Sequence, residues 1–509
     1  MLQIKSLFLI SRSAAGVYPR KKIRKLLFVG YTSKMASGNL SSSQYDAHSL
    51  PKVDTLTMFR LGFFQMALGI MSVLTLGVLN RIMIDELKVP ALIAALAIAM
   101  HQFVAPVRIW FGQISDSKPF LGHHRTGYVW LGAALFAVSA FLAVQVVWQV
   151  GASLQPGGAW TSQTTIWVAL LGLIFAIYGV ALSASSTPFV ALLVDISDED
   201  NRSKIVGIVW SMLMVGIIIG AITSSGLLRQ IQLNAPIEVI QTQVNRLFTI
   251  IPAVAFLLCL IATVGVEKKY SRLSKRSTPT VREDKITLGH ALKILTASRQ
   301  TGIFFTFLLV MTISLFMQDA VMEPYGGEVF KMTIAETTML NSFFGTGTLL
   351  GLGLTGLFIA PRIGKKTTTK LGCIAVAICF ILLIFAGVTA NPKLLQLCLV
   401  LFGFASGVTT TGALSLMLDL TAAETAGTFV GAWGLAQAMS RALATVSGGA
   451  VLNFGKYLFN TPLLPYSLVF AVQAIGMIVA LSFLARVNVS EFQRNAKDAM
   501  ASILEQELD

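Results

Sequence analysis

Residues 164–192 read TTIWVALLGLIFAIYGVALSASSTPFVAL, a run without a single charged side chain. At 1.5 Å per residue, a helix of about 20 such residues crosses the hydrocarbon of a bilayer. Eleven further apolar segments occur near 58–83, 89–112, 127–149, 204–227, 247–266, 301–322, 334–360, 368–389, 394–417, 426–452 and 465–486. The sequence therefore predicts an all-α membrane protein with twelve transmembrane helices.

Composition excludes a soluble protein. Of the 509 residues, 55% are hydrophobic and only 12% are charged, and the mean hydropathy is +0.73. Soluble domains carry about twice that share of charged residues. The net charge of +15 is concentrated in residues 1–34, with eight basic and no acidic side chains, and in residues 267–300, with nine basic and three acidic. Such segments are typical of loops beside an anionic leaflet, so we expect a lipid bilayer and no nucleic acid as partner.

The chain is predicted to have five parts. A basic and polar leader spans 1–56, a first bundle of six helices 57–266, a basic linker 267–300, a second bundle 301–486 and a tail 487–509. Residues 1–34 resemble a transit peptide in composition, but we favour a translation start near Met35, and a disordered basic tail is the other alternative. The linker and the tail each contain an amphipathic pattern that predicts a helix lying on the membrane surface.

The distribution of basic residues predicts the orientation. The connections after the second, sixth and eighth helices are rich in lysine and arginine, whereas those after the third, ninth and eleventh are nearly uncharged. Because positively charged loops stay in the cytoplasm, both termini and all even-numbered connections are expected there.

An internal repeat relates the two bundles. Four pairs of residues share one sequence offset of 224: Gly179 and Gly403, Thr187 and Thr411, Asp195 and Asp419, and Gly207 and Gly431. Two parallel repeats of six helices are typical of the major facilitator fold.

The connection after the second helix reads GQISDSKPFLGHHR at 112–125 and resembles the major facilitator signature. Gly112 permits close helix approach, and Arg125 can pair with Asp116 beyond the turn at Gly122. We expect a charged latch that holds the two halves together on the cytoplasmic side, and a merely topogenic basic loop is the alternative. Salt bridges at the same rim are predicted for Asp195, Arg202 and Asp419.

Polar side chains inside the membrane are the candidates for lining a ligand or substrate cavity, because they usually face a cavity or a partner. They are Gln65, His101, Gln102, Arg108, Gln318, Asp319, Glu323, Asn341, Gln437 and Arg441. His101 could bind the magnesium of a macrocycle, transfer protons or fill a structural position. Arg108 and Arg441 could pair with Asp319 or Glu323, or with an anionic substrate.

Other patterns point to packing. Cys259, Cys373, Cys379 and Cys398 all lie in apolar runs, so we expect buried thiols and no metal site. The glycines of the eighth helix, which are Gly345, Gly347, Gly351, Gly353 and Gly356, predict close helix packing. No nucleotide loop, catalytic triad or haem motif occurs, so we expect no enzyme.

Four stretches carry a resemblance to a known family. They read RLGFFQMALG at 60–69, LNRIMIDEL at 79–87, GHHRTGY at 122–128 and QDAVMEPYGGEVF at 318–330. Together they resemble the PucC/LhaA family, the bacteriochlorophyll-delivery branch of the major facilitators, over roughly residues 55–486. The run at 318–330 is its most specific element.

The resemblance implies a role in assembling light-harvesting complexes in the cytoplasmic or thylakoid membrane of a photosynthetic prokaryote. Chlorophyll or bacteriochlorophyll would be the ligand, antenna or photosystem polypeptides the partners, and Gln65, His101 and Gln318 the candidate magnesium ligands. The alternative is a cation-coupled secondary transporter of a small solute such as a sugar, because the long spacing from Asp116 to Gly122 also resembles sugar–cation symporters.

Overall fold

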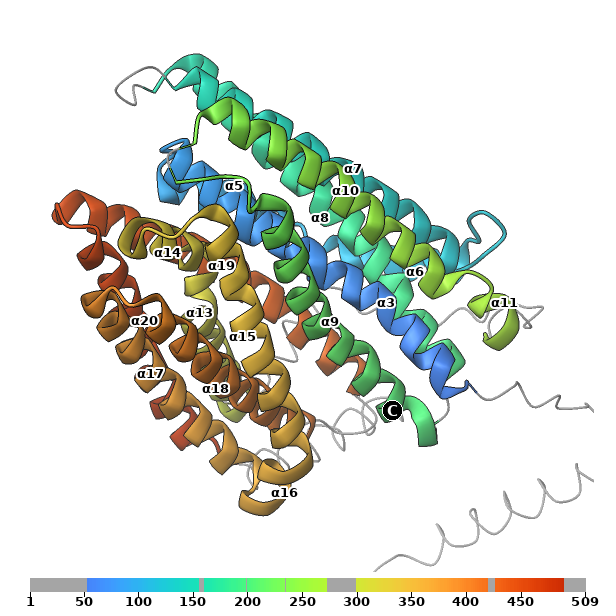
Figure 1. The fold of residues 1–509 in the computed structure, drawn as a ribbon. Coiled ribbons are helices and arrows are strands. Elements are labelled where there is room, and N and C mark those ends of the chain that lie inside the picture. Colours follow the sequence, from blue (N-terminus) through green and yellow to red (C-terminus); the bar gives the residue numbers. More distant parts are fainter. Residues whose placement is uncertain are drawn as a thin grey trace, which may run out of the picture. The chain divides into compact units, whose positions relative to one another are not determined.

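The structure is a computed structural model that describes residues 53–154, 160–197, 199–233, 235–271, 299–419 and 426–488. These residues form helices joined by short connections (Figure 1). The predictions made for residues 1–34 with Met35, and for the surface helices of the linker and tail, lie outside the described residues.

The helices before residue 272 are called the first half and are coloured blue to green in Figure 1. They are α3 (Thr55–Ser72), η1 (Val73–Val78), α4 (Leu79–Arg81), η2 (Ile82–Glu86), α5 (Ala91–Phe103), α6 (Val107–Ser117), α7 (Thr126–Ser153), α8 (Ser162–Ile196), α9 (Glu199–Leu228), α10 (Ile237–Thr263) and α11 (Val266–Tyr270).

The helices after residue 298 are called the second half and are coloured yellow to red. They are α13 (Arg299–Phe316), η4 (Met317–Ala320), α14 (Met322–Phe330), α15 (Ile334–Leu354), η5 (Thr355–Ile359), α16 (Ala360–Ile363), α17 (Lys365–Thr389), α18 (Pro392–Asp419), α19 (Ala426–Leu458) and α20 (Leu463–Arg486).

Eleven helical stretches within the described residues are long and apolar enough to cross a membrane. The remaining predicted segment, 426–452, lies in α19, which has 33 residues. Large apolar side chains such as Ile378, Ile381 and Phe385 of α17 are exposed, as expected for a surface in contact with lipid. The all-α transmembrane prediction is confirmed.

Two membrane helices are interrupted. The second predicted helix breaks between α5 and α6, where Pro106 lacks the N–H that would continue the hydrogen-bond ladder. The seventh predicted helix tightens into the 3₁₀ turn η4 and resumes as α14. Interrupted membrane helices are common at the binding sites of transporters. The residues beside both breaks are therefore candidates for a binding site.

The repeat predicted from the sequence extends to packing. The backbone carbonyl of His101 in α5 lies where a Cβ on Gly179 of α8 would stand, and the carbonyl of Phe344 in α15 lies in the same relation to Gly403 of α18. Equivalent glycines thus bring equivalent helices together. His101 and Phe344 occupy corresponding positions of the two halves.

The two halves contact each other through α5 with α19 and through α9 with α15. Gly449 of α19 packs on Ala91 and Ala95, and Gly345 of α15 packs on Ile217 and Ile218. Small residues allow this close backbone approach.

The packing role predicted for the other glycines of the eighth helix holds in part. Gly347 and Gly351 pack on the backbone of α18, but Gly353 and Gly356 have no neighbour within 4 Å of an added Cβ, so the prediction is wrong for these two. All four cysteines are free and buried, which confirms the predicted burial of their thiols.

Candidate functional site

A buried arginine joins the two halves at the end of the first membrane helix. Arg81 of α4 donates hydrogen bonds to the hydroxyl of Thr337 at 2.6 Å and to the carbonyls of Met332 at 3.0 Å and Thr333 at 3.2 Å. Asn80 donates to the carbonyl of Ala320 at 2.8 Å. We call this set the Arg81 closure, and the end of the helices where it lies the Arg81 end.

An acidic partner of Arg81 is buried in the same place. The nearest atoms of Arg81 and Asp85 are 3.4 Å apart, and only 5% and 7% of the two side chains are exposed. A Cβ on Gly327 of α14 would overlap the Asp85 carboxylate and the Arg81 guanidinium. The second glycine of the Tyr325-Gly-Gly sequence therefore makes room for an ion pair that belongs to the other half.

Two of the predicted cavity residues meet directly. Asn341 of α15 donates a 2.5 Å hydrogen bond to one oxygen of Glu323, whose other oxygen is buried without a hydrogen-bond partner among the described residues. Gly77 of η1 lies against this carboxylate and leaves no room for a Cβ. Glu323 therefore borders the Arg81 closure.

His101 lies at the end of α5, beside the helix break. Its Nδ1 is 2.5 Å from the carbonyl of Ile98, which can only accept, so the proton is on Nδ1 and Nε2 keeps its lone pair. The rings of Tyr178 and Phe175 surround the imidazole, with centroids 6.0 Å and 6.5 Å away. The next residue, Gln102, has a buried side-chain oxygen without a partner among the described residues.

Arg441 of α19 faces the same region from the second half. Its guanidinium stacks 3.9 Å from the ring centre of Phe316, and its Nε is buried without a hydrogen-bond partner among the described residues. One oxygen of Asp319 accepts a 2.7 Å hydrogen bond from the amide of Gln318. Arg108 of α6 is exposed.

The remaining candidate cavity residues make few polar contacts with the other candidates. Gln65 is buried inside α3, and Gln437 lines a cavity of about 20 Å³ between α13 and α19. Gln318 receives a long hydrogen bond of 3.5 Å from Gln473. The structure thus brings Glu323 and Asn341 together beside the Arg81 closure. It places His101 and Gln102 beside the helix break and Arg441 on the ring of Phe316, and the other candidates lie apart from these.

The signature loop forms a clamp at the opposite end of the helices, called the Arg125 end. The buried Arg125 pairs with Asp116 at 2.5 Å and with Asp195 at 2.9 Å. Glu267 accepts hydrogen bonds from the backbone N–H groups of His124, Arg125 and Thr126. Burial alone would lower the pKa of Arg125, but Asp195 and Asp116 outweigh burial and raise that pKa above its ordinary value.

Among the described residues, the partners of Arg125 all belong to the first half, so the clamp fastens helices of this half to one another. A latch across the two halves stays a prediction. A Cβ added to Gly112 would meet Thr187 of α8 at ordinary van der Waals distance, and Gly122 takes a positive φ of 74° in the turn. The salt bridge predicted for Asp195 is confirmed, while the side chains of Arg202 and Asp419 lie outside the described residues.

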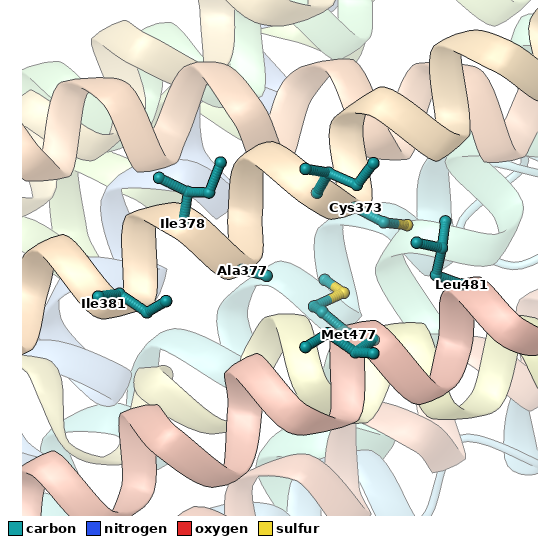
Figure 2. Close-up of a pocket in the computed structure, with 8 residues that line it drawn as sticks. Cys373, Ala377, Ile378, Ile381, Met477 and Leu481 are labelled. Atoms are coloured by element: carbon teal, nitrogen blue, oxygen red, sulfur yellow. The ribbon is translucent and has the colours of Figure 1, made fainter.

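An apolar groove lies between α17 and α20. Figure 2 shows Cys373, Ala377 and Ile381 of α17 facing it together with Met477 and Leu481 of α20. Its volume is about 210 Å³, below the roughly 300–1,000 Å³ of small-molecule sites, and its lining offers no polar group to orient a ligand. The groove is therefore part of the lipid-facing surface.

The chain is similar in sequence to a protein family and to proteins of Rhodobacter capsulatus. The model of a family described as PUCC protein matches residues 78–492. Protein PucC of Rhodobacter capsulatus is 28% identical over 84% of this chain and 91% of that protein. The bacteriochlorophyll synthase 44.5 kDa chain of Rhodobacter capsulatus is 30% identical over 84% of this chain and 94% of that protein.

A solved structure shares the fold. The nucleoside transporter NupG superposes with a TM-score of 0.62 over 84% of this chain and 98% of that chain, at 14% identity. At this identity the likeness concerns the fold alone, and it confirms the major facilitator architecture predicted from the repeat.

Proposed function

Because the chain belongs to the PucC family, we propose that it binds and delivers a chlorophyll- or bacteriochlorophyll-type pigment during assembly of light-harvesting complexes. The name of one relative, a bacteriochlorophyll synthase chain, supports a pigment as ligand. The proposed role is handling of the pigment and not its synthesis, since the fold is that of a membrane transporter.

The observation that carries the proposal is the hydrogen bonding of the His101 ring and the aromatic side chains around it. Its proton is held by the Ile98 carbonyl, so Nε2 is a free electron-pair donor, and it lies among the aromatic rings of Phe175 and Tyr178. The corresponding position of the second half is Phe344, so packing does not require an imidazole there. A neutral imidazole in apolar surroundings is suited to bind the magnesium of a pigment axially.

A titration of the purified full-length protein tests this proposal. Chlorophyll a and its magnesium-free form, pheophytin a, are added in detergent and bound pigment is measured by fluorescence quenching. We expect chlorophyll to bind more tightly than pheophytin, and His101→Ala to weaken chlorophyll binding at least about tenfold. His123→Ala, at the Arg125 end, is the matched control. Equal binding of both pigments, unaffected by His101→Ala, would contradict the assignment.

The same proposal also predicts the membrane in which the protein lies and the polypeptides that it contacts. We place the protein in the cytoplasmic or thylakoid membrane of a photosynthetic prokaryote, next to antenna or photosystem polypeptides that receive the pigment. The basic residues Lys118, Lys268 and Lys269 near the Arg125 end support an orientation with that end and both termini in the cytoplasm. Accessibility of single cysteines introduced beside Lys118 and beside Lys331 to an impermeant reagent tests the orientation.

One observation favours a second candidate, the cation-coupled transporter. Asp85 and Glu323 are buried carboxylates at the contact between the two halves, where a bound proton could govern opening of the Arg81 closure. This candidate predicts uptake of a sugar into proteoliposomes driven by an imposed proton gradient. Uptake that is lost in Glu323→Gln would support it, and absence of gradient-driven uptake would exclude it for the sugars tried.

A further inference from the structure

Glu323 of α14 lies where irregular segments of both halves meet. It belongs to the stretch at 318–330, the most specific element of the family resemblance, and the pigment proposal makes no use of its carboxyl group. The 3₁₀ turn η4 precedes α14, and a Cβ on Gly77 of the π-helical η1 would overlap this carboxyl group. Only 5% of Glu323 is exposed. The carboxyl group is therefore buried at a contact between the two halves.

The hydrogen-bond donor to this carboxyl group is neutral. One oxygen of Glu323 accepts the 2.5 Å hydrogen bond from the Asn341 amide, and the other is buried without a hydrogen-bond partner among the described residues. An amide donates a hydrogen bond but carries no charge. An ionised carboxylate that leaves water needs a cation or several donors, because burial of an unpaired charge is costly. A carboxyl group that keeps its proton avoids this cost.

The charged groups around α14 are paired with other residues. Besides η1, which has no titratable side chain, the elements that pack against α14 are α4, η2, η4, α15 and α20. Apart from Arg486 at the last position of α20, their titratable side chains are Arg81, Asp85, Glu86, Asp319, Glu336 and Tyr466. Arg81, the only cation in this set, pairs with the two acids of its own helix, and Lys456 of α19 pairs with Glu328. Among the described residues, no cation lies within ion-pair distance of Glu323.

Asp85 provides a contrast within the same closure. At 8% exposure it is almost as buried as Glu323, but a nitrogen of the Arg81 guanidinium lies 3.4 Å from its carboxylate. An opposite charge at such a distance favours the ionised form of an acid. Arg81 therefore stabilises Asp85 as an anion, whereas the surroundings of Glu323 favour the neutral acid.

We infer that Glu323 is a proton-binding site: its carboxyl group holds a proton at neutral pH while the two halves are in contact, and releases it to water when the Arg81 closure opens. In water a glutamic acid loses its proton at about pH 4. The closed form thus binds the proton more tightly than the open form, so acidic pH favours closure and rising pH favours opening. The inference does not rest on pigment binding, and it narrows the transporter candidate to one of its two carboxyl groups.

Infrared difference spectroscopy of the full-length protein tests the site directly. In a detergent without ester groups, spectra between about pH 5 and about pH 9 show the carbonyl band of a protonated carboxyl group, which shifts in D2O. We expect a band at neutral pH that disappears at alkaline pH, is absent in Glu323→Gln and is retained in Glu328→Gln. Glu328 is the matched control, because it lies on the same helix but pairs with Lys456. Asn341→Leu should shift the band, because it removes the hydrogen bond to the carboxyl group.

A cysteine introduced at the closure reports its opening. Met332 is 4% exposed and accepts the Arg81 hydrogen bond with its backbone carbonyl, so Met332→Cys places a thiol where an impermeant reagent reaches it when the closure opens. At about pH 9 we expect this variant to be labelled about tenfold faster than the same variant with Glu323→Gln, because glutamine imitates the protonated acid. At about pH 6 the two should be labelled at equal rates. The protein without the introduced thiol gives the background, since its own cysteines are buried.

Three results would overturn the inference. The first is a wild-type protein without a band of a protonated carboxyl group at neutral pH, a measurement that needs no variant. The second is a band that persists in Glu323→Gln, and the third is equal labelling at about pH 9 with and without Glu323→Gln. Pigment binding is measured separately by fluorescence quenching, so a failure of this inference is distinguished from a failure of the proposed function.

Discussion

Arg81 of the first membrane helix donates a 2.6 Å hydrogen bond to the hydroxyl of Thr337 in the eighth. The same guanidinium pairs with Asp85 in its own helix, so one buried cation connects an internal ion pair to the other half of the protein. The segments involved are irregular, because Arg81 lies between the π-helical turns η1 and η2 and binds the connection between α14 and α15. We regard the Arg81 closure as the contact that must open if this end of the protein opens.

Removal of Arg81 is expected to destabilise the protein strongly. Arg81→Met leaves the Asp85 carboxylate buried without its partner, and losing one member of a buried pair costs about 3–5 kcal/mol. Arg81→Met combined with Asp85→Leu should recover most of this loss, since the unpaired charge is gone. Unfolding by sodium dodecyl sulfate, followed by circular dichroism, measures both. A double variant no more stable than Arg81→Met alone would refute the prediction.

Gly327 is expected to tolerate no side chain. Gly327→Ala places a Cβ against Asp85 and Arg81, so we predict a loss of about 1–3 kcal/mol. Gly353→Ala is the matched control, because an added Cβ there meets no atom within 4 Å. The same unfolding assay compares them, and similar stability of the two variants would show that Gly327 is not packed as described.

The geometry of the Arg125 clamp predicts which of its two aspartates contributes more to the stability of the protein. Asp195 is 19% exposed and Asp116 is 53% exposed, so water screens the Asp116 pair more strongly. We expect Asp195→Asn to cost about 1.5–3 kcal/mol and Asp116→Asn less than about 1 kcal/mol. Thermal stability measured by size-exclusion fluorescence gives the order, and a larger effect of Asp116→Asn would contradict the assigned burial.

Much of the fold is predictable from the sequence because bilayer thickness sets the length of an apolar run. The run at 164–192 lies within α8, and the offset of 224 that links Gly179 to Gly403 corresponds to equivalent packing against α5 and α15. These features depend on local composition and on repetition along the chain, and both can be read without knowledge of tertiary contacts.

The contacts of the candidate site are less predictable. Arg81 is part of a polar sequence at the end of an apolar segment, where an arginine usually lies in water, so nothing local signals a buried partner 256 positions away. Asn341 and Glu323 meet only because the chain reverses between α14 and α15. The Asp116–Arg125 pair was predictable from the motif, but the clamp within one half depends on Asp195 and Glu267, which come from other helices.

Pigment binding at His101 is the central claim, and the absorption spectrum of the protein purified in mild detergent from a chlorophyll-producing host tests it most directly. We predict a red absorption band of bound magnesium pigment that co-elutes with the protein, is retained in His123→Ala and is lost in His101→Ala. A colourless wild-type preparation, or a band of equal intensity in His101→Ala, would contradict the account.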